Sequence, residues 1–315
     1  MPPLHARAGA ALTVKTRTES VPAVFGSGNG LERAGRSRQM NPANPRTNRS
    51  ANELGKLLRQ WRTRRGKSQL DLSGDTDVSQ RHISFIESGR SLPGRETLLD
   101  IAKALDVPLR DRNTLLLAAG FAPIYPEEPW DSQEMQSVTR ALDRMLRQHE
   151  PFPALVMDRY WNVLMTNESA PRFFDCFIDR KARSGPRNML HLIFDPKGMR
   201  PFIANWESAA QGLLERVHRE AVGRVLDDKT KELLAALLAY PDVKTEWKTP
   251  KPPSSLPMIP LSFVKDDKVL HYFSMVTTVG TPQAVTAQEL RMETMFPADE
   301  ATERHHRALL GAPSA

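Results

Sequence analysis

The chain has 315 residues, of which 40% are hydrophobic and 26% are charged, so about two domains with separate cores are expected. Its one cysteine, Cys176, excludes an internal disulfide, zinc ribbons and CxxC redox motifs, and favours a reducing, cytoplasmic setting. No apolar run approaches the ~18 residues of a membrane-spanning helix. We also expect no signal peptide at the N-terminus, since its short apolar patch is broken by Gly9.

The net charge of +7 is concentrated towards the N-terminus. Residues 1–50 carry eight basic and two acidic residues, residues 51–121 carry twelve and nine, and the remainder carries twenty-four and twenty-six. A basic excess at one end is typical of a chain that binds nucleic acid, although Arg-rich chains are often basic without such a partner. Charge alone leaves both interpretations open.

Residues 1–51 are rich in Gly, Pro, Ser, Asn and Arg and show no apolar period, which predicts a disordered basic extension. Met40 is a candidate for the natural start codon, which would make residues 1–39 an over-extended reading frame. The alternative is a basic arm that contacts DNA.

Residues 52–121 predict five short helices and therefore a compact all-α domain. Apolar residues at helical spacing define the first helix: Leu54, Leu57, Leu58 and Trp61. Gly66 ends it, and Ser68 with Asp71 then forms a variant capping box for the second helix. Ser79 caps the third helix. The fourth and fifth helices follow, the last opening at Pro108 and ending at Gly120.

This unit resembles the XRE-type helix-turn-helix of phage repressors, a lambda-repressor-like fold. The matching segments are Leu54–Arg59, Ser68-Gln69, Ser79-Gln80, Ile83-Ser84 and Ile86–Gly89. The resemblance implies that the second helix points its N-terminus at a DNA phosphate and that the third enters the major groove. It also implies a buried ion pair between Arg62 and Glu87.

The expected DNA-binding residues lie on and around the third helix. Gln80 is suited to adenine and Arg81 to guanine or a phosphate, while Phe85 contacts either a thymine methyl or the domain itself. Ser79 opens this helix, and Ser84 lies one turn further on, beside Phe85. Gln69 is expected to contact a DNA phosphate. Lys67, Ser88 and Arg90 are candidate phosphate contacts, with solvated surface as the alternative.

A proline-punctuated linker over residues 122–130 leads to a predicted α+β domain over residues 131–296. Helices are expected over residues 132–149, 167–174, 199–225 and 229–240, the first with Met135, Val138, Leu142 and Met145 on one face. Strands are expected over residues 153–157, 160–165, 259–264, 269–278 and 288–296. Residues 297–315 are predicted to be a flexible tail.

Several segments of this second domain resemble MmyB-like transcription regulators. They are Leu116–Pro123, Ala154–Val163, Asn167, Arg200, Asn205-Trp206 and Leu237–Pro241. The resemblance implies a PAS-like ligand-binding domain, and some members of that family bind a fatty acid. The chain departs from the family pattern at Leu256–Pro260, where the family has His-Pro-x-Val-Gly, so the ligand does not carry over from the family.

We therefore expect an elongated apolar pocket for a fatty-acid-like ligand in the second domain. Arg200 is the first candidate for its carboxylate, with a surface role at a helix start as the alternative. Asn205, Trp206 and His271 are weaker candidates for the same mouth or wall. In the alternative function, the domain is only a dimerisation or protein-interaction platform.

An enzyme is not expected. Cys176 lies among phenylalanines with no adjacent base, and the eight histidines show no metal-ligand spacing. No Walker A loop, dinucleotide-binding GxGxxG or GxSxG elbow occurs. The sequence thus predicts a cytoplasmic, homodimeric transcription regulator that binds double-stranded DNA, with no catalytic or metal site and no cofactor beyond a bound apolar ligand.

Overall fold

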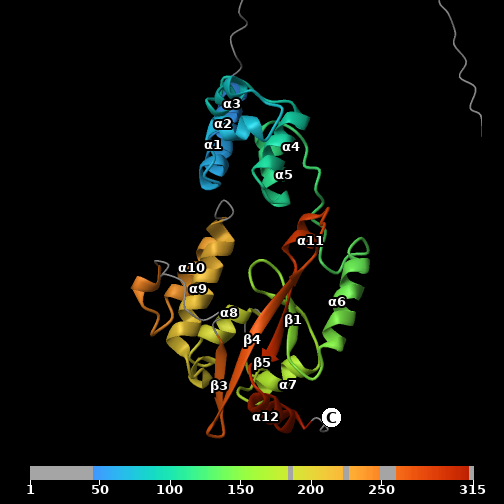
Figure 1. The fold of residues 1–315 in the computed structure, drawn as a ribbon, viewed down its shortest axis with the longest axis vertical. Coiled ribbons are helices and arrows are strands. Elements are labelled where there is room, and N and C mark those ends of the chain that lie inside the picture. The colour runs from blue at the N-terminus through green and yellow to red at the C-terminus, as the bar shows by residue number, and fades with distance from the viewer. Residues whose placement is uncertain (1–44, 184–186, 223–226, 249–259, 312–315) are drawn as a thin grey trace, which may run out of the picture. The chain divides into compact units, whose positions relative to one another are not determined.

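The computed structural model describes residues 45–183, 187–222, 227–248 and 260–311 (Figure 1). Its first region is the expected five-helix unit. The helices are α1 (Pro45–Arg64), α2 (Gln69–Gly74), α3 (Gln80–Glu87), α4 (Arg95–Ala104) and α5 (Leu109–Ala118). Their apolar faces share one core that includes Leu54, Trp61, Ile86 and Leu98.

The predicted helix starts of α2 and α3 are confirmed. Ser68 accepts a hydrogen bond from the backbone N–H of Asp71, whose carboxylate accepts one from the N–H of Ser68. Ser79 caps α3 by accepting from the N–H of His82 at 3.3 Å. Gly66 has a φ of +65°, so it adopts the left-handed conformation that ends α1 at little steric cost.

The extension expected over residues 1–51 is wrong for its last seven residues, because α1 begins at Pro45. Proline suits a first helical turn, because the N–H groups of that turn have no acceptor within the helix and the lack of an N–H in proline therefore costs no hydrogen bond. The predictions for residues 1–44 lie outside the described residues.

The second region is an α+β domain. Its sheet comprises β1 (Ala154–Met157), β2 (Val163–Thr166), β3 (Leu261–Lys265), β4 (Lys268–Thr278) and β5 (Arg291–Pro297). All its neighbours are antiparallel, in the order β2-β1-β5-β4-β3. The helical elements are α6 (Gln136–Gln148), α7 (Ser169–Asp175), α8 (Met189–Phe194), the 3-10 turn η1 (Arg200–Phe202), α9 (Trp206–Val222), α10 (Asp228–Leu238), the 3-10 turn η2 (Thr245–Lys248), α11 (Val285–Glu289) and α12 (Glu300–Leu310). This is the expected PAS-like arrangement.

Both faces of β1 are covered, which explains its unbroken apolar sequence. Successive side chains of a strand point to opposite faces. Leu155 and Met157 accordingly join the core formed with α7 to α10, whereas Ala154 and Val156 join the core formed with α6. Figure 1 shows α6 on one side of the sheet and α8, α9 and α10 on the other.

Three expectations about the helices of this domain are wrong. Met145 is 37% exposed, and Leu146 takes the buried position on α6. The helix expected from residue 199 starts only at Trp206, because Ile203 leaves helical geometry to bridge to Phe263. Residues 288–289 end the short helix α11 and so do not begin the last strand.

The flexible tail expected over residues 297–315 is wrong for residues 300–310, which form α12. Its first turn is capped by Asp299, and Thr302, His306 and Leu310 are buried at helical spacing. Because Thr302 and His306 are polar, the segment shows no apolar residues at helical spacing in the sequence.

His306 joins α12 to the sheet and makes the domain sensitive to acid. Its Nε2 lies 2.8 Å from the carbonyl of Pro151, which only accepts, so Nε2 carries the proton and Nδ1 accepts from the hydroxyl of Tyr272 at 2.7 Å. Burial lowers the pKa of His306 below its ordinary value, and the same cause lowers the pKa of His191.

We predict that the free energy of unfolding falls as the pH drops below the ordinary histidine pKa of ~6.5. The unfolded chain takes up protons there before the folded chain does, so lower pH favours unfolding. Thermal melts between about pH 7.5 and about pH 5.5 test this. His306→Gln should show a smaller drop in melting temperature than the wild type, and an equal drop would contradict the assignment.

No helix among the described segments is both long enough and apolar enough to cross a membrane.

Candidate DNA-binding surface and ligand pocket

A buried ion pair fixes α3 against α1. The Nε and Nη2 atoms of Arg62 donate to the two carboxylate oxygens of Glu87 at 2.6 and 2.9 Å, and Gln69 donates to Glu87 at 2.8 Å. The side chains of Arg62 and Glu87 are only 13% and 5% exposed. The pair expected from the sequence is therefore present, and its hydrogen bonds raise the pKa of Arg62.

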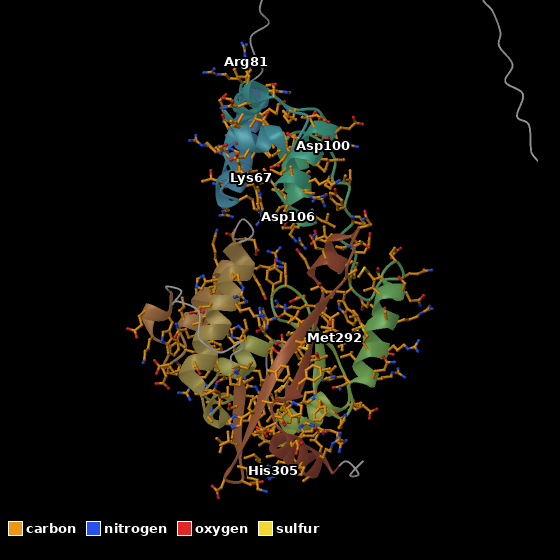
Figure 2. All side chains as sticks on the ribbon, viewed as in Figure 1. Lys67, Arg81, Asp100, Asp106, Met292 and His305 are labelled. Carbon is orange, nitrogen blue, oxygen red and sulfur yellow. The ribbon has the colours of Figure 1, made fainter. Side chains whose placement is uncertain are left out.

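The outward face of α3 carries the side chains expected to contact bases. Gln80 and Arg81 are exposed in its first turn, and Ser84 is half-buried one turn further on. Figure 2 labels Arg81, whose guanidinium lies 5.4 Å from the ring centre of Phe85. Arg90 approaches the same ring at 5.8 Å, so Phe85 packs with two cations and is half-buried.

Two of the expected phosphate contacts are engaged within the protein. The amide nitrogen of Gln69 is bonded to Glu87, and the ammonium of Lys67 bonds Asp75 and the carbonyl of Ala104, both at 2.7 Å. Ser88 is exposed, with its hydroxyl bonded to the carbonyl of Phe85. Ser79 caps α3, and because Ser79 is exposed, the start of that helix lies at the surface.

Gln80→Ala is expected to relax discrimination at one base pair of the binding site. Its amide can bond adenine N6 and N7 together, so losing it should cost ~1–3 kcal/mol on the preferred sequence and almost nothing on random DNA. Titration of both DNAs measures the difference, with the exposed Lys103→Ala on α4 as the control. An equal loss on both DNAs would make Gln80 a backbone contact.

A cavity of about 250 Å³ lies in the second domain between the sheet, the β1–β2 turn and α9 to α11. Its lining mixes charged groups with an apolar wall. The residues are Arg159, Trp161, Val217, Glu220, Thr230, Leu233, Val276, Thr278, Gln288, Glu289, Leu290 and Arg291. It is more polar than the pocket that the sequence predicted.

Trp161 forms one wall of this cavity in an unusual conformation. It is 2% exposed and has a φ of +67°, which is rare for a bulky residue and occurs mostly where the surroundings enforce it. The β1–β2 turn holds it, since Asp158 accepts backbone hydrogen bonds from Tyr160 and Asn162. The N–H of Met189 also donates to the carbonyl of Trp161 at 2.9 Å.

Two guanidinium groups lie over the ring of Trp161. The Cζ of Arg291 is 4.1 Å and that of Arg216 is 4.5 Å from the ring. Glu220 pairs with both cations, and Arg216 also bonds Glu293 at 3.1 Å. The sequence does not single out Arg291, which follows Leu290 within the strand expected over residues 288–296.

A chain of ion pairs runs from the cavity to α5. Arg159 bonds Asp227 at 2.6 Å and Glu289 at 3.1 Å. Glu289 in turn accepts two hydrogen bonds from the guanidinium of Arg110, both at 2.9 Å. Next to this pair, the side chain of Gln288 accepts from the N–H of Leu109 at 2.7 Å. Two cavity residues therefore bond the first turn of the last DNA-domain helix.

None of the four ligand residues expected from the sequence is among those that line this cavity. Arg200 pairs with Asp242 at 3.2 Å and lies 4.3 Å over the ring of Trp206. Asn205 bonds the backbone of Pro260 and Ser262, and His271 bonds the hydroxyl of Ser262 at 2.8 Å. Asn205 thereby joins the start of α9 to β3.

Nothing within the described part of the chain groups three or more His, Cys, Asp or Glu residues as a metal site would. Burial raises the pKa of Cys176, and its thiol donates to the carbonyl of Arg172 at 3.2 Å. A thiol with a raised pKa is a poor nucleophile near neutral pH.

Two family models match the chain. Residues 138–309 match the MmyB-like transcription regulator ligand binding domain, which is more than half of the chain, and residues 58–111 match a helix-turn-helix family. The first match extends through most of α12, and the second spans α2, α3 and α4. A comparison with curated proteins found no match to the sequence.

Proposed function

We propose, since the chain belongs to the MmyB-like transcription regulators, that it binds a specific operator through α3 and senses a small apolar, fatty-acid-like ligand in its second domain. Regulation of transcription through DNA and recognition of a ligand follow from the family. The operator contacts, the class of ligand, a homodimeric state and a cytoplasmic location are parts of the proposal.

The exposed start of α3 is the observation that carries the DNA-binding part. Ser79 caps that helix, and the Arg62–Glu87 pair fixes its buried side. This leaves Gln80, Arg81 and Ser84 for base edges. Arg90 and Ser88 are proposed to contact phosphates, whereas Gln69 and Lys67 would first have to exchange their present partners.

The ion-pair chain supports coupling between the ligand and DNA. A ligand in the 250 Å³ cavity would touch Glu289, which pairs with Arg110 at the start of α5. A ligand can favour one arrangement of the two domains only by binding it more tightly than the other. Glu289 lines the cavity and also pairs with Arg110 of α5. A ligand in the cavity can therefore have different affinities for arrangements of the two domains with and without this pair.

A homodimer is proposed because one small helix-turn-helix reads too few base pairs for high specificity, whereas two copies multiply it. Analytical ultracentrifugation with and without operator DNA tests this part separately. A monomer on DNA would remove the dimer and leave the DNA-binding proposal intact.

Native mass spectrometry of the full chain, combined with a map of its genomic binding sites, tests the proposal. We expect one recurrent DNA sequence and an added mass that matches a carboxylic acid with an alkyl chain. A recurrent sequence without any bound or added acyl ligand would favour the interaction-platform function.

A further inference from the structure

We infer that two copies of the chain pair through the outward side of α6, arranged antiparallel about a two-fold axis. This inference rests on the homodimer of the proposed function and assigns the surface that forms it. That surface, which we call the α6 face, consists of the exposed side of α6 and the segment that leads into it, residues 127–135. Figure 1 shows α6 on the side of the sheet away from α8, α9 and α10.

The C-terminal half of the α6 face is basic. Arg140, Arg144 and Arg147 follow one another at intervals of four and three residues, so they lie along one side of the helix, and all three are exposed. Asp143 pairs with Arg147 at 2.8 Å. Arg140 and Arg144 form no ion pair with any described residue, so two cations on this side of the helix lack a counter-charge there.

The segment that leads into α6 is acidic. It carries four acidic side chains, all exposed, and no basic one: Glu127, Glu128, Asp131 and Glu134. Glu127 pairs with Arg110 of α5, whereas the other three form no ion pair within the described ranges. One continuous stretch of chain therefore carries opposite charges at its two ends.

Both halves of the α6 face are fixed to the same domain. The hydroxyl of Thr286 donates to the carbonyl of Glu128 at 2.6 Å. Between the two halves, Met135 is 3% exposed and shares a core with Leu142 and Leu146, which form the buried side of α6. Because this surface is already ordered in one copy, little conformational entropy is lost when it pairs.

An antiparallel pair of copies sets each charged half against the opposite half of the partner. In a two-fold interface every pair of contacting residues occurs twice, once in each direction. One register matches all three acidic side chains that lack an ion pair. Its pairs are Glu128 with the partner subunit's Arg147, Asp131 with the partner subunit's Arg144, and Glu134 with the partner subunit's Arg140. The axis then passes near Ser137, which is exposed and small enough for two helices to approach closely.

Other arrangements fit these charges less well. Parallel helices would set arginine against arginine, and a nucleic-acid backbone would be repelled by the acidic half. With 13 residues, α6 is about 20 Å long, so the contact is small and its specificity comes mainly from charge. We therefore expect the dimer to weaken as salt rises from about 0.1 M to about 1 M, where the screening length falls from ~10 to ~3 Å.

Two charge-reversed variants test this pairing in the full-length protein without DNA. The basic half is reversed by Arg140→Glu, Arg144→Glu and Arg147→Glu, and the acidic half by Glu128→Lys, Asp131→Lys and Glu134→Lys. Each variant alone sets like charges together, so sedimentation equilibrium should show its dimer dissociation constant raised by more than about a hundredfold. An equimolar mixture of the two should form a heterodimer, because opposite charges then meet in both halves.

A matched control makes the same change of net charge at exposed lysines elsewhere in the ligand-binding domain. It carries Lys181→Glu, Lys197→Glu and Lys268→Glu. This variant should dimerise as tightly as the wild type, since none of the three lysines lies on the α6 face. Melting curves establish that every variant is folded.

The outcomes separate this inference from the proposed homodimer. A wild type that is monomeric in free solution overturns the inference, and one that is monomeric on operator DNA as well overturns the homodimer too. A dimeric wild type whose reversed variants remain dimeric overturns only the α6 face. Reversed variants that are both monomeric and do not associate with each other also overturn it, because pairing by charge requires the mixture to associate.

Discussion

Glu87→Ala should unfold the DNA-binding region at much lower denaturant than the wild type, at a cost of ~3–5 kcal/mol. The substitution leaves the buried guanidinium of Arg62 without its carboxylate and also removes the acceptor of Gln69. An unpaired buried charge is costlier than the lost attraction alone. Because the chain has five tryptophans, fluorescence would not report on this core alone, so hydrogen exchange of the amides of α1 around the buried Trp61, followed as urea is raised, measures the effect.

Two further variants separate the causes of that loss. Glu53→Ala removes an exposed acidic side chain from α1 and should change the stability by less than ~0.5 kcal/mol. Arg62→Met combined with Glu87→Leu removes both charges and should recover much of the stability lost in Glu87→Ala. A Glu87→Ala protein as stable as Glu53→Ala would contradict a structural role for the pair.

Phe173→Ala should destabilise the ligand-binding domain by ~3–5 kcal/mol. Phe173 is fully buried at the centre of an aromatic cluster, with ring centres 5.2 to 5.4 Å from those of Phe177, Phe263 and Tyr272. Its removal leaves a cavity between α7 and the sheet that rigid neighbours cannot close. Thermal unfolding of the variant and the wild type measures the difference.

Phe273→Ala is the matched control, because Phe273 is half-buried and stacks on Phe296 at 5.5 Å. The same atoms are deleted, but water can reach the site, so the loss should be clearly smaller than for Phe173→Ala. Similar losses in the two variants would show that the cluster around Phe173 is not the centre of the core.

Local signals in the sequence were enough to predict the DNA-binding region. The Ser68–Asp71 capping box, the Ser79 cap and the spacing of Leu54, Leu58 and Trp61 each depend on residues within two helical turns. Such signals can be recognised in short stretches of the sequence. The partners of the Arg62–Glu87 ion pair are 25 residues apart, so only the family resemblance, and no local pattern, predicts this pair.

The 250 Å³ cavity could not be predicted in the same way. It combines Trp161 from a strand turn, Glu220 from α9 and Arg291 from β5, which meet only through the order of strands in the sheet. A single sequence does not contain that order as a local pattern. Arg200 is expected at the pocket because a guanidinium can bind a carboxylate through two hydrogen bonds, but in the structure it pairs with Asp242.

The helix α12 in the polar C-terminal segment could not be predicted for a different reason. Average composition predicted a loose tail, but Thr302, His306 and Leu310 are spaced by four residues and face the core. Two of these three are polar, so a count of apolar residues misses them. Their burial depends on partners in distant segments, among them Pro151 and Tyr272.

We propose that occupancy of the second domain changes the affinity of α3 for DNA. The most direct test of this proposal is the dissociation constant of the full-length protein for its mapped operator, measured by fluorescence anisotropy with and without saturating octanoate. We expect the dissociation constant to change by about 5- to 150-fold, the usual range of coupling between two sites. An unchanged dissociation constant, with octanoate shown by calorimetry to be bound, would contradict it.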